Sequence, residues 1–532
     1  MIVGRSRSFF LDYFLNRFST SFRCHEQFAF QVFGVFQKRQ VCRSVALQVK
    51  KEIFVRQGAL IKSLTAADFR RASVEEAEGK PFSHEGIRSL RQHLSASRRH
   101  VLGTDESRLS MRSKSWSTTA AFGPPSLWIT INPSDQDPIA QVFAGADIDL
   151  DRFDATKGPS STQRGRNMAS DPFASAKFFH FMINTLLEVV FGIKKTSSGL
   201  QRSPGIFGSV RAYIGSVEAQ GRGTLHLHML VWLMDAPTGS VMREALMEET
   251  FQQRIRSFIE ATIHADIDEN NLAEILQLPK LTAVSYSRPI SPITQREDSI
   301  LQVKGLARTV QLHTCHLSTC LRIVNGRREC KRKAPFSLSP QAWVNSNGEW
   351  GPKRLCSNLN NWNPWLLRCL RSNHDVKLIM NGTETCVLVL YTTNYACKKQ
   401  SRSSNTTALL ADKLAVASGL AATCDNVDQD TLLTANKRLL QRCAHSLLTQ
   451  REFSGPEIMS YLMGWGDRFE SHVYVCFYVD AAMRALKHAF PMLASSAIPG
   501  MPQNGGTTLV SELFVNFDQP LILWQRMRLR RQ

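Results

Sequence analysis

The apolar and polar positions in the middle of the chain predict a buried strand followed by a long helix. Residues 126–133 (SLWITINP) form a short apolar run bounded by prolines, which is typical of a strand in a sheet. After a linker rich in Asp, Gly and Ser, apolar residues recur at helical spacing from Pro172 to Gly192. Either Ser170 or Asp171 can cap the start of this helix.

The following segments predict a hairpin and a second long helix. Residues 210–220 and 224–233 are predicted strands, and the Gly-Arg-Gly break between them is a hairpin signal. A helix is predicted from Ser240 to about His264. Strand, helix, strand, strand and helix in this order favour an α+β fold, in which helices pack on a central antiparallel sheet.

The flanking regions are predicted to be helical. Residues 26–56 carry apolar residues at helical spacing, and a second helix is expected over 79–94 with Ser83 as its N-cap. Beyond residue 400 the chain is polar and helical, with a loose end. These patterns divide the chain into a disordered tail or leader (1–24), a basic helical lead-in (25–120), a core with the hairpin (121–265), a Cys/His-rich insert with a tyrosine segment (266–400) and a helical C-terminal region (401–532).

The charge of the chain suits a polyanionic partner. Its 532 residues include 65 Lys and Arg against 45 Asp and Glu, a net charge of +20. Nucleic acid is the expected partner, ahead of an anionic membrane surface. The most apolar helix-length run, residues 178–193, is interrupted by His180, Asn184 and Glu188, so no membrane-spanning helix is expected.

The N-terminal sequence and the cysteine content bear on the cellular compartment in which the protein works. The first 24 residues contain four Arg, several Ser and one acidic residue, which fits a mitochondrial presequence. A disordered tail or a wrongly assigned start is the alternative. Twelve cysteines without a repeating framework favour a reducing compartment over a secreted disulfide scaffold.

The predicted hairpin carries the best candidate for a metal site. It contains His226-Leu227-His228, and the two-residue period of a strand places both imidazoles on one face, where they can hold one divalent cation. A three-residue loop places Glu218 opposite His226, whereas a five-residue loop places Gln220 there. Glu218 is favoured as third ligand because a carboxylate neutralises cation charge. The alternative is two partly buried histidines with Glu218 as an ion-pair partner.

Residues 390–400 contain a candidate nucleophile. Tyr391 and Tyr395 are four positions apart, so both phenols share one face if the segment is helical. Lys398 and Lys399 follow on the next turn, where their ammonium groups can neutralise phosphate oxygens. Tyrosine is a chemically sound nucleophile when a metal polarises the phosphoryl group.

Residues 313–337 concentrate cysteine, histidine and basic residues. Zinc uses such ligands, although the spacing matches no common zinc finger. A zinc knuckle and a basic loop with free thiols are therefore both open. The candidate ligands are His313, Cys315, His316, Cys320 and Cys330.

The segment EAQGRGTLHLHMLVWL (218–233) resembles the metal-binding motif of Helitron transposon replication initiators, which are rolling-circle HUH endonucleases. The resemblance extends in order over roughly residues 26–480. It includes GPPSLWITINPSD (123–135), DPFASAKFFHFM (171–182), GIFGSVRAYIGSVEAQ (205–220), NHDVKLIMNG (373–382), LYTTNYACKKQ (390–400) and SYLMGWGDRFESHVY (460–474). It implies a central antiparallel sheet of HUH/Rep type with helices packed on it, and helical N- and C-terminal extensions.

The resemblance also implies a mechanism. The histidine pair, with Glu218 or Gln220, would hold Mg²⁺ or Mn²⁺. Tyr391 and Tyr395 would be paired nucleophiles that cut single-stranded DNA and leave a 5′-phosphotyrosine link. Arg222, which the hairpin tip forces outward, is a candidate DNA contact. Nuclear residence follows from this substrate and the basic charge.

One part of the family's architecture has no counterpart in the sequence. Helitron proteins carry a helicase after the initiator domain, yet G-x-x-x-x-G-K-[ST] is missing, since Gly79-Lys80 is followed by Pro81. No helicase or ATPase activity is expected, and a separate helicase is an expected partner. The competing hypotheses are an inactive DNA-binding remnant of a transposon protein and a metal hydrolase that uses water.

Overall fold

The computed structural model describes residues 21–380, except 198, 222, 238, 318, 319 and 325, together with residues 405, 407–411, 429–475, 484–486 and 488–489. The chain divides into two compact units, residues 1–471 and 472–532. The elements below belong to the first unit. Most of the predicted leader, residues 1–20, lies outside the described residues.

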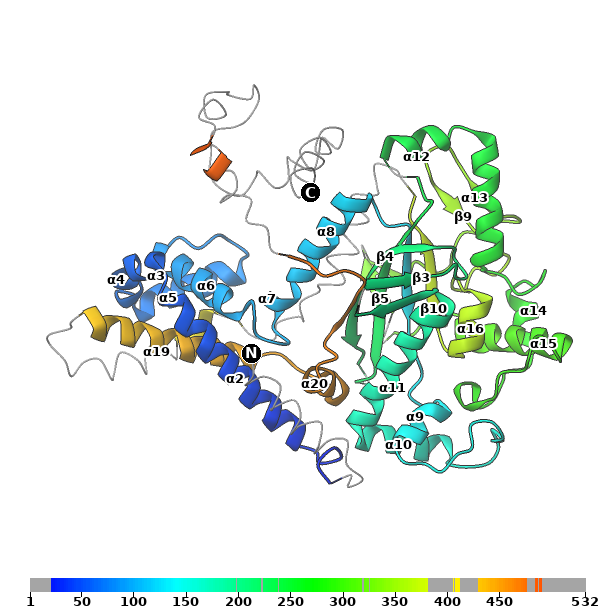
Figure 1. Cartoon of the computed structure of the whole chain (residues 1–532), viewed down its shortest axis with the longest axis horizontal. Coiled ribbons are helices and arrows are strands. Elements are labelled where there is room, and N and C mark those ends of the chain that lie inside the picture. Colours follow the sequence, from blue (N-terminus) through cyan, green and yellow to red (C-terminus); the bar gives the residue numbers. More distant parts are fainter. Residues whose placement is uncertain are drawn as a thin grey trace. The chain divides into compact units, whose positions relative to one another are not determined.

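A five-stranded antiparallel sheet forms the centre of this unit (Figure 1). The predicted central antiparallel sheet and its three inner strands are confirmed, whereas the two short edge strands were not predicted. In spatial order the strands are β10 (His374–Leu378), β1 (Leu127–Ile131), β5 (Leu225–Leu233), β4 (Val210–Ala219) and β11 (Arg468–Glu470).

Helix α11 (Pro172–Thr185) packs on one face of the sheet and continues as a π-helical turn, η1 (Leu186–Val190). Its N-cap is Asp171, whose carboxylate accepts a hydrogen bond from the Ala174 N–H at 3.0 Å. The other predicted cap, Ser170, bonds within the preceding helix instead. Apolar side chains of this helix and of the inner strands form one buried core.

The length and apolar composition of this helix raise the question of whether it spans a membrane. By length and composition, Pro172–Val190 could cross a bilayer, and no other helix of the described residues meets that test. In its most apolar window, however, 67% of the residues are buried inside the protein. Phe173, Phe178 and Ile183 lie in the core with the strands. This is the pattern of a helix that fills the core of a domain.

The helix predicted from Ser240 to His264 is in fact two helices, α12 (Gly239–Ala245) and α13 (Glu249–Thr262). The chain turns between them, because the backbone bonds at Met247 and Glu248 span three residues rather than four. The Gln252 side chain stabilises this turn by donating to the Leu246 carbonyl at 2.8 Å.

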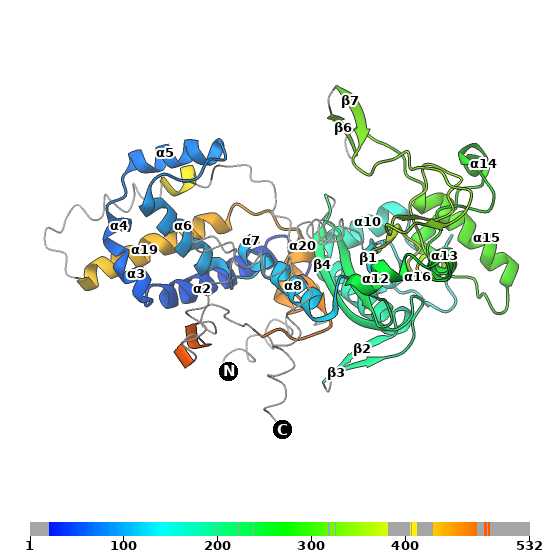
Figure 2. The ribbon, with the colours of Figure 1, turned by 90° about the horizontal axis from the view of Figure 1, so that it is seen from above.

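The predicted helical lead-in packs with a helix from far along the chain. Helices α2, α6 and α19 lie side by side in both ribbon views and share a second apolar core (Figure 1, Figure 2). Ser83 is not the cap of the second predicted helix, because His84 Nδ1 accepts the Gly86 N–H at 3.1 Å. The bounds are α2 (Phe28–Gln48), α6 (Glu85–Arg98) and α19 (Gln429–Leu448).

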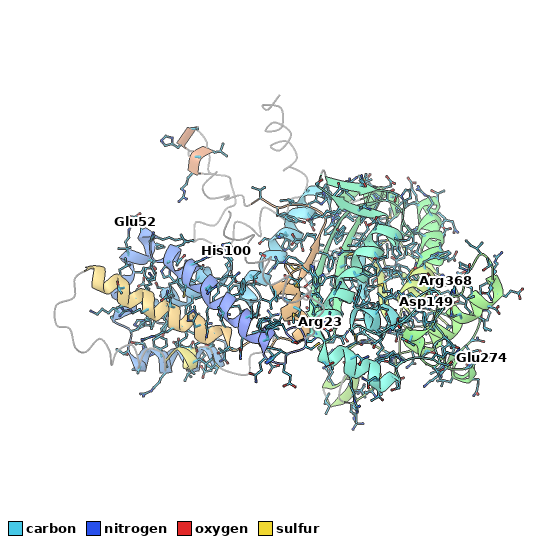
Figure 3. All side chains as sticks on the ribbon, turned by 60° about the horizontal axis from the view of Figure 1, so that its bottom comes forward. Arg23, Glu52, His100, Asp149, Glu274 and Arg368 are labelled. Atoms are coloured by element: carbon cyan, nitrogen blue, oxygen red, sulfur yellow. The ribbon has the colours of Figure 1, made fainter. Side chains whose placement is uncertain are left out.

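Specific contacts join these helices to the sheet. Arg23 forms an ion pair with Asp171 at 2.9 Å, so it reaches the start of α11 from just before α2 (Figure 3). Phe33 of α2 stacks on Tyr461 of α20 (Gly455–Leu462), with ring centroids 5.4 Å apart.

The remaining elements of the described residues are short. They are α3 (Glu52–Arg56), α4 (Gly58–Lys62), α5 (Ala66–Ala77), α7 (Asp105–Arg108), α8 (Ser110–Phe122), α9 (Pro138–Phe143), α10 (Ser161–Ser170), α14 (Leu272–Gln277), η2 (Val284–Tyr286), α15 (Arg296–Leu306), η3 (Ala307–Gln311), α16 (Pro364–Leu370), and the strand pairs β2–β3 (Ile193–Thr196 and Gly199–Arg202), β6–β7 (Leu321–Val324 and Arg327–Cys330) and β8–β9 (Trp343–Val344 and Trp350–Gly351).

We expect His374 to make the fold sensitive to acid. Its ring is fully buried and accepts the Asn363 N–H at 2.9 Å, and burial lowers its pKa from 6.5 to about 4. As the pH falls below about 6.5, the unfolded state therefore takes up a proton first, and the free energy of unfolding decreases. In urea unfolding, His374→Gln should lose less stability than wild type between pH about 7 and about 5.

The matched control is His100→Gln, because His100 is exposed. This variant should keep the wild-type dependence of stability on pH. An identical pH dependence in wild type and His374→Gln would contradict the prediction.

Candidate functional site

The β4–β5 hairpin brings the predicted third ligand opposite the histidine pair. Its loop has three residues, because the Gln220 N–H donates to the Thr224 carbonyl at 2.8 Å. Glu218 consequently pairs with His226 across the two strands. The three-residue loop and the register that follows from it are confirmed.

The two histidines lie on a polar face of the sheet. Directly paired residues of antiparallel strands point to the same face. Thr130 of β1 pairs with His228 on one side and with Asp375 of β10 on the other. Lys377, two positions along β10, shares this face. Leu227, between the histidines, points into the buried core on the other side.

Three potential metal ligands converge on this face. One side-chain ligand atom each from Glu218, His226 and His228 lies within 4.8 Å of the other two. The Nε2 atoms of the two histidines are 2.9 Å apart, and the rings are nearly perpendicular at 83°. Glu218 Oε2 is 3.8 Å from His226 Nε2.

Both imidazoles are held in the neutral form that binds metals. Burial lowers the pKa of His226 to about 4, and burial with the nearby charges of His226 and Lys377 lowers the pKa of His228 to about 3. Thr130 Oγ1 lies 3.0 Å from His228 Nδ1, and Trp128 stacks on the same ring at 5.4 Å. These contacts fix the ring so that its Nε2 faces His226.

The residues fit a divalent cation. Two facing Nε2 atoms at 2.9 Å can either share one proton or hold one cation. Neighbouring ligands of an octahedral ion with bonds of about 2.1 Å lie about 3 Å apart, which matches this separation.

Gln220, the alternative third ligand, makes a different contact. It lies on the same face as Glu218 but nearer the loop, where it is exposed and its amide donates to Asn132 Oδ1 at 2.7 Å. Among the His, Cys, Asp and Glu side chains, the one grouped with the histidines is that of Glu218.

A buried arginine beside the hairpin was missed in the sequence. Arg108 of α7 is 3% exposed and donates to the Ser216 hydroxyl and to the Val217 carbonyl, both at 3.3 Å. It lies 3.9 Å from Glu218 and 3.8 Å from Glu457. Burial opposes its charge, but the surrounding acidic groups outweigh burial and raise its pKa. Arg108 therefore stabilises strand β4 and the Glu218 carboxylate of the candidate site.

A cavity of about 1020 Å³ opens beside the same end of the sheet. Asn373 lines it and accepts a hydrogen bond from the Asn132 side chain, which in turn contacts Gln220. Lys157 and Arg164 also line the cavity. The charge of these side chains suits an anionic group close to the candidate metal site.

A comparison with protein families identifies this region. The family model described as "Helitron helicase-like domain at N-terminus" matches residues 10–231. Residues 10–231 are a Helitron-type domain. The match includes β1, α11 and β4 and ends within β5, so it contains Glu218 and both histidines. No curated protein matches the chain.

The chain has a second group of potential ligands outside the matched region. The side chains of His313, Cys315, Cys320 and Cys330 each offer a ligand atom within 4.8 Å of the others. His316, the fifth predicted ligand, is not in this group, and its backbone binds Cys320 instead. Burial and hydrogen bonds with the neighbouring thiols raise the pKa of Cys315 to about 11.

Several predicted site residues lie outside the described residues. They are the candidate DNA contact Arg222, the nucleophiles Tyr391 and Tyr395, and the phosphate-neutralising Lys398 and Lys399. Their roles stay predictions. The described chain runs through β10, the strand that pairs with β1 on the side away from β5, to Met380.

We expect the Helitron-type domain to bind Mn²⁺ through the histidine pair. His226→Ala/His228→Ala removes two of three ligands and should weaken Mn²⁺ affinity by about tenfold or more, as measured by calorimetry or by electron paramagnetic resonance. Because a bound ion stabilises the folded state, Mn²⁺ should also raise the melting temperature of wild type but not of the variant.

The control for this measurement is the exposed His100→Ala. It should bind Mn²⁺ as wild type does. Equal Mn²⁺ affinity in wild type and in a correctly folded His226→Ala/His228→Ala variant would disprove the assignment.

Proposed function

We propose that this Helitron-type protein is a metal-dependent endonuclease that nicks and rejoins single-stranded DNA at the ends of a transposon. The observation that carries the proposal is the convergence of Glu218, His226 and His228 on the polar face of the central sheet. Neutral imidazoles beside a carboxylate are ligands for a divalent cation, and phosphodiester chemistry is a common use of such a cation.

The residues of the site have separate tasks. His226 and His228 would hold the ion, and Glu218 would bind it and offset its charge. When bound, Mg²⁺ or Mn²⁺ supplies a Lewis acid that polarises the scissile phosphate. Lys377, on the same sheet face, would add positive charge along the DNA backbone.

The cleavage step would use a tyrosine. The phenol oxygen of Tyr391 or Tyr395 attacks phosphorus, the P–O3′ bond breaks, and the released 3′-oxygen takes up a proton while the phenol loses one. Lys398 and Lys399 would neutralise the non-bridging phosphate oxygens. Since one phosphodiester replaces another, rejoining needs no nucleotide. The second tyrosine would hold a second strand end, which permits strand exchange.

The overall charge supports the choice of substrate. A net charge of +20 favours a nucleic acid, and a Helitron-type domain indicates a DNA partner. A cationic cavity beside the candidate metal site would accept the phosphates that flank the cut. A protein with this substrate would work in the nucleus, together with a separate helicase.

The proposal predicts a covalent protein–DNA adduct. Wild type incubated with Mn²⁺ and a labelled single-stranded oligonucleotide of transposon-end sequence should give a labelled band that survives denaturation. Tyr391→Phe/Tyr395→Phe should abolish this band, and His226→Ala should reduce it at least about a hundredfold because the phosphate is no longer polarised.

The other outcomes identify the competing functions. Cleavage without an adduct that survives Tyr391→Phe/Tyr395→Phe but not His226→Ala would reveal a hydrolase that uses water. Tight DNA binding with neither cleavage nor adduct would reveal an inactive remnant. Either result would overturn the proposal.

A further inference from the structure

We propose that His313, Cys315, Cys320 and Cys330 bind one structural zinc ion, and that this ion holds the basic β6–β7 hairpin as a contact surface for the DNA backbone. The zinc site stands on the geometry of the described residues alone. The choice of DNA as the partner rests on the proposed function.

The hairpin brings two of the cysteines together. Leu321 of β6 pairs with Cys330 of β7, so Cys320 and Cys330 lie at the open end of the two strands. The Lys331 N–H donates to the Cys320 carbonyl at 2.7 Å and extends this pairing by one step. Because each strand carries a cysteine at the open end of the hairpin, the two thiols lie close to each other.

The other two ligands come from the segment before the hairpin. His313 Nε2 lies 3.2 Å from Cys330 Sγ and 3.4 Å from Cys315 Sγ. In a tetrahedral zinc site, bonds of about 2.3 Å to sulfur and about 2.0 Å to nitrogen place neighbouring ligand atoms about 3.5 Å apart. The observed separations therefore need little adjustment to accept the ion.

Backbone N–H groups already point at two of the sulfur atoms. The His316 N–H lies 3.2 Å from Cys320 Sγ, and the Arg332 N–H lies 3.4 Å from Cys330 Sγ. Such donors stabilise the thiolate charge that a metal requires. His316 contributes its backbone N–H to Cys320 Sγ. Its side chain lies outside the group of four ligands.

The hairpin has too little apolar core to hold itself together. Its buried cluster contains Cys320, Cys330 and Ala334, with Leu321 and Phe336 packed against them. The three cysteines are free thiols, so no disulfide supports this segment. Units this small depend on disulfides or metals.

The ligand types select the metal and its role. Three sulfurs and one imidazole are the soft set that zinc prefers, unlike the carboxylate and imidazoles around Glu218. Four protein ligands complete a tetrahedron and leave no position for a substrate, so the zinc is structural. His313 ties the site to the rest of the protein, since its N–H donates to the Asn358 carbonyl at 2.7 Å.

The surface of the hairpin is strongly basic. Figure 2 shows β6 and β7 projecting from the other labelled elements. Glu329 is the one acidic residue from Leu321 to Lys333. The exposed cations of this stretch are Arg322, Arg327, Arg328, Lys331, Arg332 and Lys333. Because a phosphate backbone binds clustered Lys and Arg by releasing counterions, DNA is the partner that this surface fits.

The zinc site is tested by metal content. The full chain, purified without chelators under reducing conditions, should contain one zinc ion per molecule. Cys320→Ser/Cys330→Ser should lose it, whereas Cys369→Ser, at an exposed thiol, and His226→Ala/His228→Ala should retain it. Substitution of cobalt for zinc should give the visible bands of a tetrahedral ion with sulfur-to-cobalt charge transfer.

Two results would overturn the zinc assignment. One is wild-type protein that takes up no zinc even after reconstitution. The other is a full complement of zinc in Cys320→Ser/Cys330→Ser. Neither measurement involves DNA cleavage, so the zinc site and the proposed endonuclease can fail independently.

The DNA surface is tested by salt dependence. Arg327→Gln/Arg328→Gln changes two exposed arginines that are not zinc ligands. Binding of a fluorescent single-stranded oligonucleotide should weaken, and the slope of log K against log salt concentration should become shallower by about 0.7 for each lost phosphate contact. The matched control Arg70→Gln/Arg71→Gln, an exposed pair on α5, should leave the slope unchanged.

Zinc content must remain at one ion per molecule in both arginine variants. An unchanged slope in Arg327→Gln/Arg328→Gln, or an equal change in both variants, would show that the hairpin is not a specific DNA contact.

Discussion

The pairing of β4 with β5 is the interaction on which the candidate site depends. A shift of one residue would turn the two imidazoles into the apolar core and expose Leu227 instead. The core prevents such a shift, because the alternate residues of β5 are fully or almost fully buried; these are Leu225, Leu227, Met229 and Val231. Packing of these residues in the apolar core therefore aims the potential ligands toward the other face of the sheet.

The second constraint is that the buried charges beside the hairpin compensate one another. Arg108 lies among Glu218, Glu457 and Asp467 in a region largely closed to water. A buried charge without a partner is costly. Since Arg108 has two other carboxylates nearby, Glu218 can turn toward a cation without leaving the guanidinium uncompensated. The network thus links the packing of α7 and α20 to the carboxylate of the site.

Local patterns predicted the centre of the fold but not its edges. The Gly-Arg-Gly break and the alternation around His226 are short-range signals. They led to the hairpin but left two registers open, of which the structure has the one with the three-residue loop. β10 and β11 have five and three residues, and they are strands because the sheet supplies partners from distant parts of the chain. Arg108 gave no signal, because the sequence Asp-Glu-Ser-Arg of α7 is that of an exposed turn.

Small differences in local geometry account for other errors. His84 rather than Ser83 caps α6, since an imidazole nitrogen one position later reaches the Gly86 N–H. In the Cys/His segment the spacing alone left five candidates, and the β6–β7 register decides which side chains meet.

The function of the site depends on whether Glu218, His226 and His228 bind one divalent cation. Crystals soaked in Mn²⁺ and measured at the manganese absorption edge test it directly. We expect one strong anomalous peak between Glu218 Oε2 and the two facing Nε2 atoms. Manganese bound elsewhere, with no peak between these three side chains, would contradict it.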